Sequence, residues 1–405
     1  MSAKTNSHDR YQLMGMKYFA MPPRFDPESG TTVFEPEAPG YGYWVGGHNA
    51  VFDPDAGRFY LFHRVRKPLG KGRGGVCRIA ESSDGMTFKV IWQASKEQFD
   101  AESIEVASLI RDPASGKWRL YVCFQPTGGR GWRIDLVEAD TIDKLDAWHH
   151  RTVMAPADYG VGSIKDPKVY VIGGLYHAFA CVPPRERIVE HPDGSREPIG
   201  GDSTALLTSE DGIYWRDFRY VFEPGQGARG QWGQFRARIN SVVWLEPMWV
   251  AFFDGGEGAY DNYEEWCGVA VSSDLLNWRR VSRNAPWVRS PHGCIRYMDA
   301  LRVGDELFYY YEYTRPWRLA RQCDQRAGVD SATDSDILGG MSKRSAGMFF
   351  TGVARSGFLP RRVAHPFKGG GRDDCMGAPA RSRAGGRSGP TPGGTVESRG
   401  KNHAL

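Results

Sequence analysis

The sequence lacks the features of a membrane or secreted protein. No apolar run approaches the length needed to cross a bilayer. The N-terminal stretch has neither a continuous apolar segment nor a small-residue cleavage site after one. We therefore expect a soluble, cytoplasmic protein that has no membrane partner.

Cysteines are few and scattered. There are 7, an odd number, and they form neither a C-x-x-C pair nor a cluster with histidine at metal-ligand spacing. We expect reduced thiols, several of them packed as small core residues, and no metal site built from cysteine. No cofactor is expected either.

An excess of charge of one sign is also missing. The 52 basic and 48 acidic residues leave a net charge of +4 over 405 residues, with much of the excess near the C-terminus. A nucleic-acid-binding protein is expected to carry a basic stripe with interleaved aromatic residues inside its folded part. The absence of such a stripe argues against nucleic acid as a partner.

Aromatic residues, in contrast, are abundant. They make up 13% of the chain, with 13 Trp, 18 Tyr and 20 Phe. Aromatic residues favour strands and also suit sugar-binding surfaces. Strands that alternate with helical segments are not evident, which argues against an α/β fold. The composition therefore favours an all-β protein.

A short motif, in which a small polar turn precedes an aromatic residue, recurs along the chain. It occurs as SSDGMTF at Ser82–Phe88, TSEDGIYW at Thr208–Trp215 and SSDLLNW at Ser272–Trp278, with a degenerate copy at Glu138–Trp148. An apolar strand leads into each copy. Asp and Gly favour the turn, and the aromatic residue begins another strand.

A second recurring unit precedes each turn motif and occurs once more near the end of the repeats. It is a hairpin of two apolar strands around a Gly- or Pro-bearing turn, and the five copies start at His48, Glu105, Asp166, Ile239 and Tyr297. Each hairpin with its following turn motif supplies four antiparallel strands, which is one propeller blade. The alternation predicts a five-bladed β-propeller. A sandwich or barrel with accidental similarity is the alternative, but it does not require two motifs in strict alternation.

The pattern decays after Thr314. The fifth hairpin is clear, whereas its closing strands are hard to place, with residues 345–358 as a candidate. We therefore expect that the last blade is incomplete. Residues 368–405 are rich in Gly, Arg, Ser and Pro and are predicted to be disordered. An alternative interpretation is that the chain is read out of frame from about residue 317. We expect a lead-in segment at 1–39, a propeller catalytic domain at 40–358 and a tail at 359–405.

The hairpins and turns over about residues 40–314 resemble the five-bladed propeller glycosidases of glycoside hydrolase families 32, 43, 62, 117 and 130. In those families, acidic residues at the start of the first strand of different blades face the central channel. Residues 166–170 (DPKVY) match the family-43 pattern D-P-x-V-F, and residues 105–110 (EVASLI) match E-G-P-x-I-Y in its carboxylate and apolar pair. The resemblance implies Glu105 as the proton donor, with Glu102 as a rival, and Asp166 as the residue that orients the substrate and tunes the acid.

The first blade departs from this pattern. The families supply a base or nucleophile there as an aspartate, whereas here the register gives His48, followed by Asn49. A histidine titrates in the range of a general base, or it only binds a sugar hydroxyl together with Asn49. The missing carboxylate then comes from elsewhere, for example Asp261, Glu264 or Glu265.

Several other residues are candidates for binding the substrate. Lys165, Arg238 and Arg296 stand at matching strand starts, and arginine binds carboxylate or phosphate through a bidentate fork. Salt bridges between blades are the alternative role for these cations. Trp44 is a candidate sugar-stacking platform.

The leading functional prediction is a glycoside hydrolase that cleaves a small or terminal glycosidic bond by carboxylate acid/base catalysis, with a carbohydrate as its partner. Two alternatives stay open. One is a phosphorylase that uses phosphate bound by the channel arginines, and the other is a propeller that binds carbohydrate without catalysis. Some propellers of this kind hold a channel calcium ion, but no loop in the sequence supports one.

Overall fold

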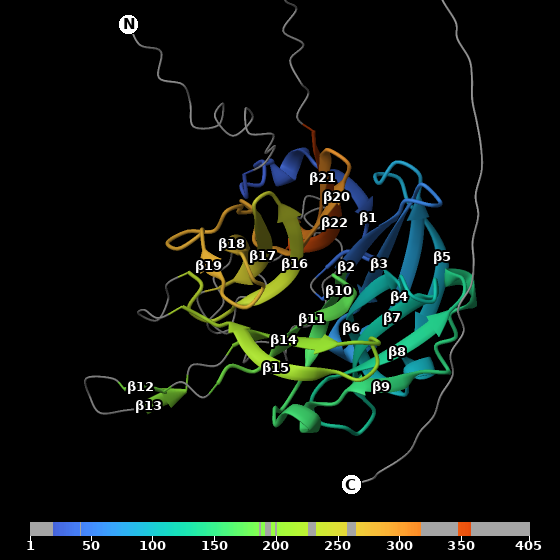
Figure 1. The fold of residues 1–405 in the computed structure, drawn as a ribbon. Coiled ribbons are helices and arrows are strands. Elements are labelled where there is room, and N and C mark those ends of the chain that lie inside the picture. The colour runs from blue at the N-terminus through green and yellow to red at the C-terminus, as the bar shows by residue number, and fades with distance from the viewer. Residues whose placement is uncertain are drawn as a thin grey trace, which may run out of the picture. The chain divides into compact units, whose positions relative to one another are not determined.

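The computed structural model describes residues 19–40, 42–185, 188–190, 196–198, 201–225, 232–256, 265–316 and 347–357, all within one unit that ends at Phe358. Antiparallel strands dominate these residues and are arranged as five blades around a common centre (Figure 1). The predicted all-β, five-bladed propeller is therefore confirmed. The tail at 359–405 and the segment at 317–346 lie outside the described residues.

The first four blades each have four strands in chain order. The first comprises β2 (Trp44–Asp53), β3 (Arg58–Arg66), β4 (Gly74–Ser82) and β5 (Lys89–Ser95), and the second comprises β6 (Ala101–Arg111), β7 (Trp118–Pro126), β8 (Arg133–Ala139) and β9 (Arg151–Met154). The third comprises β10 (Lys165–Ile172), β11 (Leu175–Val182), β14 (Ser203–Ser209) and β15 (Arg216–Phe222), with the small hairpin β12 (Ile188–Glu190) and β13 (Arg196–Pro198) inserted. The fourth comprises β16 (Arg238–Leu245), β17 (Met248–Gly255), β18 (Trp266–Ser272) and β19 (Arg279–Arg280).

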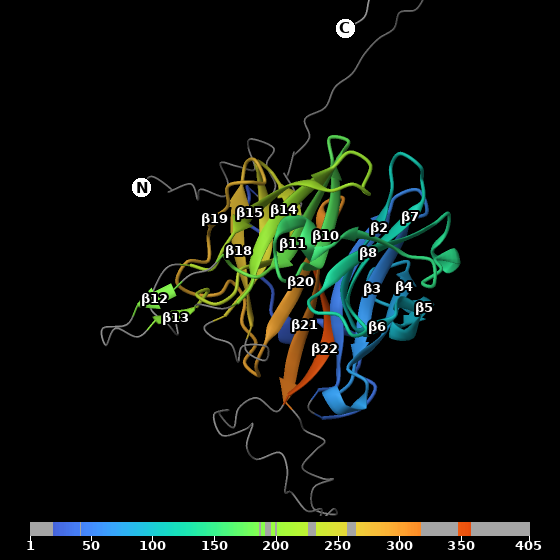
Figure 2. The same ribbon diagram turned by 90° about the horizontal axis from the view of Figure 1, so that it is seen from below.

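The fifth blade is built from both ends of the described chain. It comprises β20 (Ile295–Val303), β21 (Glu306–Pro316), β22 (Gly347–Gly357) and, antiparallel to β22, the N-terminal strand β1 (Thr31–Phe34). β22 lies inside the segment 345–358 that was the candidate for closure. It also meets β2 through the pair Trp44 and Phe349, so blades five and one share one sheet (Figure 2).

Part of the predicted lead-in segment thus belongs to the propeller. A strand of four residues has too little alternation to be recognised from sequence, and only its pairing with β22 defines it. The residues before β1 pack on the same blade. The ring of Phe25 stacks on that of Tyr309 with a centroid distance of 4.8 Å, and Tyr311 donates to the carbonyl of Pro27 at 2.7 Å.

The recurring turn motif joins the third and fourth strands of blades one, three and four. In blade one, a single carboxylate oxygen of Asp84 accepts hydrogen bonds from the amides of Met86 and Thr87, both at 2.8 Å. The hydroxyl of Ser82 accepts from the amide of Gly85 at 2.9 Å, and Gly85 has a φ of +72°. The same carboxylate bonds recur at Asp211 and Asp274. The repeat is therefore a side-chain-capped turn.

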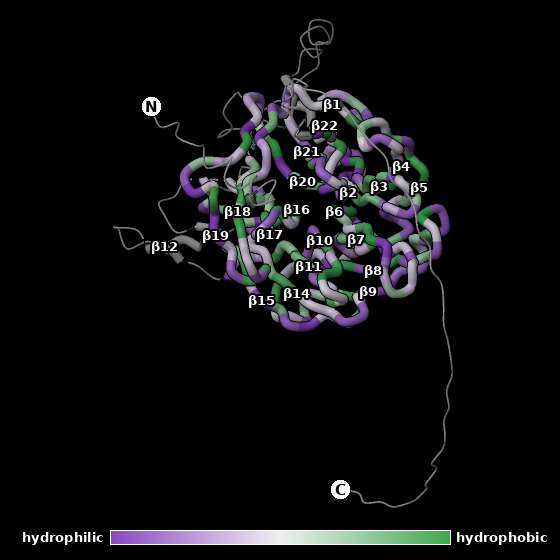
Figure 3. Tube along the Cα trace, turned by 45° about the horizontal axis from the view of Figure 1, so that its top comes forward, coloured by the Kyte–Doolittle hydropathy of each residue, from purple (hydrophilic) through white to green (hydrophobic). Residues whose placement is uncertain are grey.

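The inner strands β2, β6, β10, β16 and β20 lie next to one another around the centre (Figure 3). Side chains on these strands bond to the backbone of a neighbouring inner strand. The pairs are Asn49 with the amide of Leu109 at 2.8 Å, Ser108 with Val169 at 2.9 Å, Ser241 with Ala300 at 3.0 Å and Asp299 with Ala50 at 2.8 Å. These bonds hold the inner strands in a common register.

Five small helical turns of 3-10 type complete the described elements: η1 (Pro27–Ser29), η2 (Leu69–Lys71), η3 (Lys96–Phe99), η4 (Ile142–Lys144) and η5 (Pro156–Tyr159). Among the described residues, no helix has the length and apolar character that crossing a membrane requires. The five cysteines within the described ranges are buried free thiols.

Candidate functional site

The inner strands β2, β6, β10 and β20 share a β-bulge near their first residues. In β10 the pairing with β11 passes from Lys165 opposite Cys181 to Lys168 opposite Phe179, so two residues of β10 face one residue of β11. The same step occurs in β2, β6 and β20. A bulge bends the strand and re-aims one side chain, and bulges are common beside active sites.

The first residue of the bulge is Gly47 in β2, Glu105 in β6, Asp166 in β10 and Tyr297 in β20. Three of these four have left-handed backbone, with φ of +59° at Gly47, +50° at Asp166 and +51° at Tyr297. That conformation costs free energy for a residue other than glycine, and strained residues of this kind gather at functional sites. The bulge row is therefore the candidate site.

The predicted register of blade one is shifted by one residue. Gly47, not His48, is the counterpart of Asp166, because the bulge interrupts the alternation from which the register was counted. His48 is fully buried, and burial lowers the pKa of its imidazole to about 4, with Asp299 partly offsetting the effect. A neutral imidazole enclosed by protein has no access to a substrate, so His48 is not placed as a base.

Arg64 fills the space that an acid at position 47 would need. A Cβ at Gly47 would lie 2.7 Å from the Nε atom of Arg64 and 3.2 Å from a methyl group of Val106. The carboxylate that the resemblance led us to expect in blade one is absent from this position, where Gly47 and the side chain of Arg64 from the neighbouring strand β3 occupy the space.

Glu105 is held by two arginines from blade one. Its Oε2 lies 3.0 Å from Nη2 of Arg64, and its Oε1 lies 3.0 Å from Nη1 of Arg66. Burial alone would raise the pKa of Glu105, but Arg64 and then Arg66 outweigh it and lower the pKa to about 2. Glu105 is thus an anion at neutral pH. Its rival Glu102 is exposed on the same strand.

Asp166 is buried and less tightly held. Its Oδ2 lies 3.5 Å from Nη1 of Arg238 and 3.7 Å from Nζ of Lys165. Within the described part of the chain, neither carboxylate oxygen of Asp166 accepts a hydrogen bond. Lys165 also lies 3.8 Å from Asp202, which divides its charge between two carboxylates.

The predicted basic pocket is instead a balanced ion-pair network. Arg238 contacts Asp254 at 2.6 Å and Glu265 at 2.8 Å, and Arg296 contacts Glu312 at 2.6 Å. The described cations of the network are Arg64, Arg66, Lys165, Arg236, Arg238 and Arg296, and its carboxylates are Glu105, Asp166, Asp202, Asp254, Glu265 and Glu312. Arg238 and Arg296 therefore form salt bridges, which was the alternative role considered for them.

One carboxyl group in the network differs from the rest. Burial raises the pKa of Asp254 to about 6, because the nearby Glu265 adds to the desolvation while Arg238 only partly compensates. Asp254 is fully enclosed and accepts the amide hydrogen of Tyr297 at 3.1 Å. It therefore supports the backbone of the bulge in β20 and is not open to a ligand.

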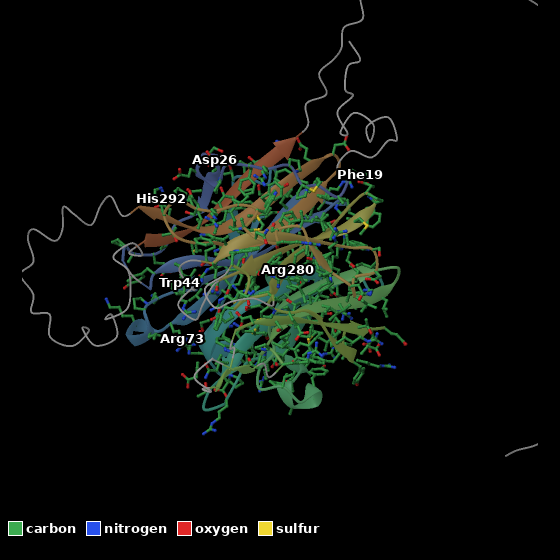
Figure 4. The ribbon with its side chains drawn as sticks, turned by 90° about the vertical axis from the view of Figure 1, so that its left-hand side faces the viewer. Phe19, Asp26, Trp44, Arg73, Arg280 and His292 are labelled. Atoms are coloured by element: carbon green, nitrogen blue, oxygen red, sulfur yellow. The ribbon has the colours of Figure 1, made fainter. Side chains whose placement is uncertain are left out.

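Aromatic rings lie among the guanidinium groups. The Cζ atom of Arg238 is 4.3 Å from the ring centroid of Tyr297, and that of Arg66 is 4.5 Å from the ring of Trp44. Trp44 is only 5% exposed, so it packs as a cation–π partner of the network and is not presented as an open stacking platform. Figure 4 shows Trp44 near Arg73 at one side of the propeller.

Two further predicted residues have other placements. Asn49 donates to Asp299 at 3.1 Å and accepts from the amide of Leu109 at 2.8 Å, so its side chain links three blades. Asp261 and Glu264 lie outside the described residues. Glu265, the third suggested source of a carboxylate, is enclosed within the network. Among the described residues, no three His, Cys, Asp or Glu side chains gather in a way that would hold a metal ion.

Tyr297, Arg64 and Arg66 were not predicted from the sequence as site residues. A signal for each was present. Tyr297 begins the fifth hairpin as Asp166 begins the third, and Arg64 and Arg66 are two apart on a strand, which places both on one face.

Comparisons with known proteins support the fold. No protein-family model and no curated protein match the sequence. A solved structure described as a glycoside hydrolase is similar with a TM-score of 0.54 and 13% identity, over 89% of this chain and 98% of that one. A thermostable family-43 glycoside hydrolase has a TM-score of 0.50 and 16% identity, over 69% of this chain and 86% of that one.

A third similar structure is an N-acetylgalactosamine deacetylase from F. plautii in complex with blood group B trisaccharide. It has a TM-score of 0.52 and 13% identity, over 82% of this chain and 94% of that one. The resemblance to the five-bladed propeller glycosidases that the motifs indicated is thus confirmed in the fold. Fold alone does not assign an activity, which has to be argued from the site.

Proposed function

We propose that this protein is a glycoside hydrolase whose reacting groups are Glu105 and Asp166. One observation carries the proposal: the two carboxylates occupy the same bulge position on the neighbouring inner strands β6 and β10. Cleavage of a glycosidic bond needs one group to protonate the leaving oxygen and one carboxylate to attack or to activate water. Carboxylates at matching positions of adjacent strands supply such a pair.

The charges favour a division of roles that differs from the sequence-based one. Arg64 and Arg66 stabilise the anion of Glu105, and a proton donor must instead hold its proton at working pH. We therefore assign Glu105 as the nucleophile or base. Asp166, which has longer ion-pair distances, is assigned to the leaving-group oxygen.

Tyr297 is the third group in the bulge row. Burial raises the pKa of its phenol, and Asp166 raises it further while Arg238 opposes this. The phenol therefore stays neutral and keeps a proton to donate to a sugar oxygen. Its left-handed backbone is supported by the bond from its amide to Asp254.

The test uses aryl glycosides of several sugars with poor and with activated leaving groups. Activated leaving groups need no protonation, so they restore turnover to a variant that lacks the acid but not to one that lacks the nucleophile or base. We expect Asp166→Asn to lose about 10²–10⁴-fold on poor leaving groups and to recover on activated ones. Glu105→Gln is expected to stay inactive on both.

Glu102→Gln is the matched control, since Glu102 lies on the same strand but is exposed. It should keep wild-type turnover. Recovery of Glu105→Gln on activated substrates would return the acid role to Glu105. Full activity of both site variants on poor leaving groups would reject the pair altogether.

The second candidate function is carbohydrate binding without catalysis. The observation that favours it is the replacement of the third acid by Gly47 and Arg64. Measurable sugar binding with no turnover across the panel, in the presence and absence of phosphate, would select it. Phosphorolysis is less well supported, because the channel arginines of the described chain already face carboxylates.

A further inference from the structure

A second basic region lies away from the bulge row, at the junction of blades three and four. It is a cavity of about 910 Å³ between the end of β15, the strand β19 and the loop after it. Arg279, Arg280, Arg283 and Arg289 contribute to its lining, together with Trp232 and Trp278. Figure 4 shows Arg280 apart from Trp44 and Arg73. None of the residues that line the cavity belongs to the ion-pair network around Glu105, so the cavity is a separate site.

The charges in this cavity are not balanced. Arg279, Arg283 and Arg289 are exposed, and none of the three has a carboxylate within 4.0 Å among the residues that the structure describes. The lining includes one carboxylate, that of Glu223. Its Oε1 accepts from Nε of Arg185 at 3.0 Å, so an arginine that is not among the lining residues already neutralises it.

The arginines are also held in place. Arg280 donates to the carbonyl of Glu223 at 2.6 Å and lies over the ring of Phe222, with its Cζ 4.6 Å from the centroid. Arg283 donates from Nε to the carbonyl of Arg280 at 3.4 Å, and Arg289 lies 4.8 Å from the ring centroid of Trp266. Arg279, Arg283 and Arg289 carry like charges around one cavity with no carboxylate beside them among the described residues, so an anionic ligand would reduce their mutual repulsion.

We infer that this cavity binds an anionic carbohydrate, a short segment whose sugar rings carry carboxylate or sulfate groups. Guanidinium groups bind both anions through charge-assisted forks. The volume lies at the upper end of ordinary ligand sites of roughly 300–1,000 Å³, which exceeds the need of a lone inorganic anion. The partly buried Trp278 offers an apolar wall for a sugar ring.

Nucleic acid fits these observations less well. A single strand is bound by several aromatic faces along a basic groove. Among the aromatic residues that line the cavity, Phe222 and Trp232 are only 4% and 7% exposed, so Trp278 alone offers a ring face. The four arginines also surround one cavity instead of following a stripe.

The test measures binding to the full-length protein by calorimetry. The probes are a short oligogalacturonate, a sulfated dextran fragment, a neutral arabino-oligosaccharide and a single-stranded oligodeoxynucleotide. We expect the two acidic glycans to bind, with an affinity that falls as the salt concentration rises. The neutral oligosaccharide is not expected to bind at this site. The stronger of the two acidic probes distinguishes carboxylate from sulfate recognition.

The decisive variant changes Arg279, Arg283 and Arg289 to Ala together. Its control changes Arg58, Arg151 and Arg355 to Ala, which removes the same charge from exposed positions on blades one, two and five. The cavity variant is expected to bind acidic glycan about tenfold or more weakly, and the control less than about twofold.

Three results would overturn the inference: equal losses in the two variants, no binding of either acidic glycan to the wild type, or tighter binding of the oligodeoxynucleotide than of both glycans. The readout does not depend on turnover. Glu105→Gln should bind the acidic probes like the wild type even if the proposed hydrolysis fails, so the two proposals fail separately.

Discussion

The propeller has two arginine-rich regions that treat the same side chain in opposite ways. In the central network, Arg238 is 2% exposed and contacts the carboxylates of Asp254 and Glu265. In the cavity between blades three and four, Arg279 and Arg289 are exposed and have no carboxylate partner among the described residues. Counting arginines in the sequence does not separate these regions.

A buried cation requires a carboxylate partner, whereas an exposed one is stable without it. A buried ion without a partner costs several kcal/mol, so the centre of the propeller retains as many carboxylates as cations. At the surface, water screens an unpaired guanidinium, and the charge is free to serve a ligand. The central arginines are therefore read as structural and site-shaping, and the cavity arginines as binding groups.

The strongest test of this comparison removes a central charge. Arg238→Met leaves Asp254 and Glu265 buried beside each other without their shared cation. We expect a loss of about 3–5 kcal/mol in the free energy of unfolding, measured by urea denaturation at neutral pH. Arg289→Met is the surface control and should change stability by less than about 0.5 kcal/mol. Similar losses of stability in both variants would contradict the claim that the central arginines are structural and the cavity arginines are not.

A second test removes a central anion. Glu105→Gln keeps the size of the side chain but leaves Arg64 and Arg66 facing each other, and we expect a loss of about 3 kcal/mol at pH 7. The pKa of Glu105 is depressed in the folded state, so its contribution is present above about pH 4.5 and is lost as pH falls toward 2. The gap between variant and wild type should therefore narrow on acidification, as followed by denaturation at several pH values. A constant gap would show that packing, not charge, causes the loss.

A third test concerns a buried group with no charged partner. Burial lowers the pKa of His63 to about 3, and its ring stacks on Phe34 of the closing strand β1 with a centroid distance of 4.1 Å. The unfolded chain takes up a proton below about pH 6.5, so stability should fall as pH drops from there toward 3.

His63→Phe keeps a ring against Phe34 and removes this titration. Between pH 7 and pH 5 the wild type should lose about 2 kcal/mol more than the variant. Thermal unfolding at the two pH values measures the difference. Equal losses of stability in the wild type and the variant would assign the acid sensitivity to other groups. His48 is the first of these to examine, since burial lowers its pKa to about 4.

The smallest effect is expected in the cavity. Alanine in place of Arg279, Arg283 or Arg289 should change the free energy of unfolding by no more than about 0.5 kcal/mol each, because these side chains are exposed. Removing all three should leave stability equal or slightly higher at low salt, since their mutual repulsion disappears. A large loss of stability, seen in the same denaturation assay, would make these arginines structural and remove the contrast.

Much of the fold was predictable because its signals are local. The Asp84, Asp211 and Asp274 turns form hydrogen bonds within three residues, so their sequences repeat wherever the turn recurs. Each hairpin likewise pairs segments that are close in the chain. β1, the edge strand of the fifth blade, was not predicted because its partner β22 lies more than 300 residues away in the chain.

The candidate site was predictable only in part. Glu105 and Asp166 were predicted from the resemblance of residues 105–110 and 166–170 to motifs of the propeller glycosidases. That Gly47 and not His48 occupies the matching position in blade one could not be predicted. A bulge adds one residue to the strand and reverses which side chain faces the channel. The spacing of Arg64 and Arg66 places both on one face of β3, but that they bind Glu105 could not be predicted, since Glu105 belongs to another blade.

Local signals in the sequence were enough to predict five blades with a four-stranded plan, because turn chemistry and alternation act over a few residues. The carboxylates Glu105 and Asp166 were predicted only through the resemblance to the propeller glycosidases. Only the tertiary structure decided which cations are neutralised at the centre and which stay unpaired in the cavity. Ion pairing depends on distances between blades, and it joins Arg296 to Glu265 and Arg64 to Glu105 across the gaps between sheets. The electrostatic energy that separates a structural arginine from a binding one arises at those distances, which no local pattern records.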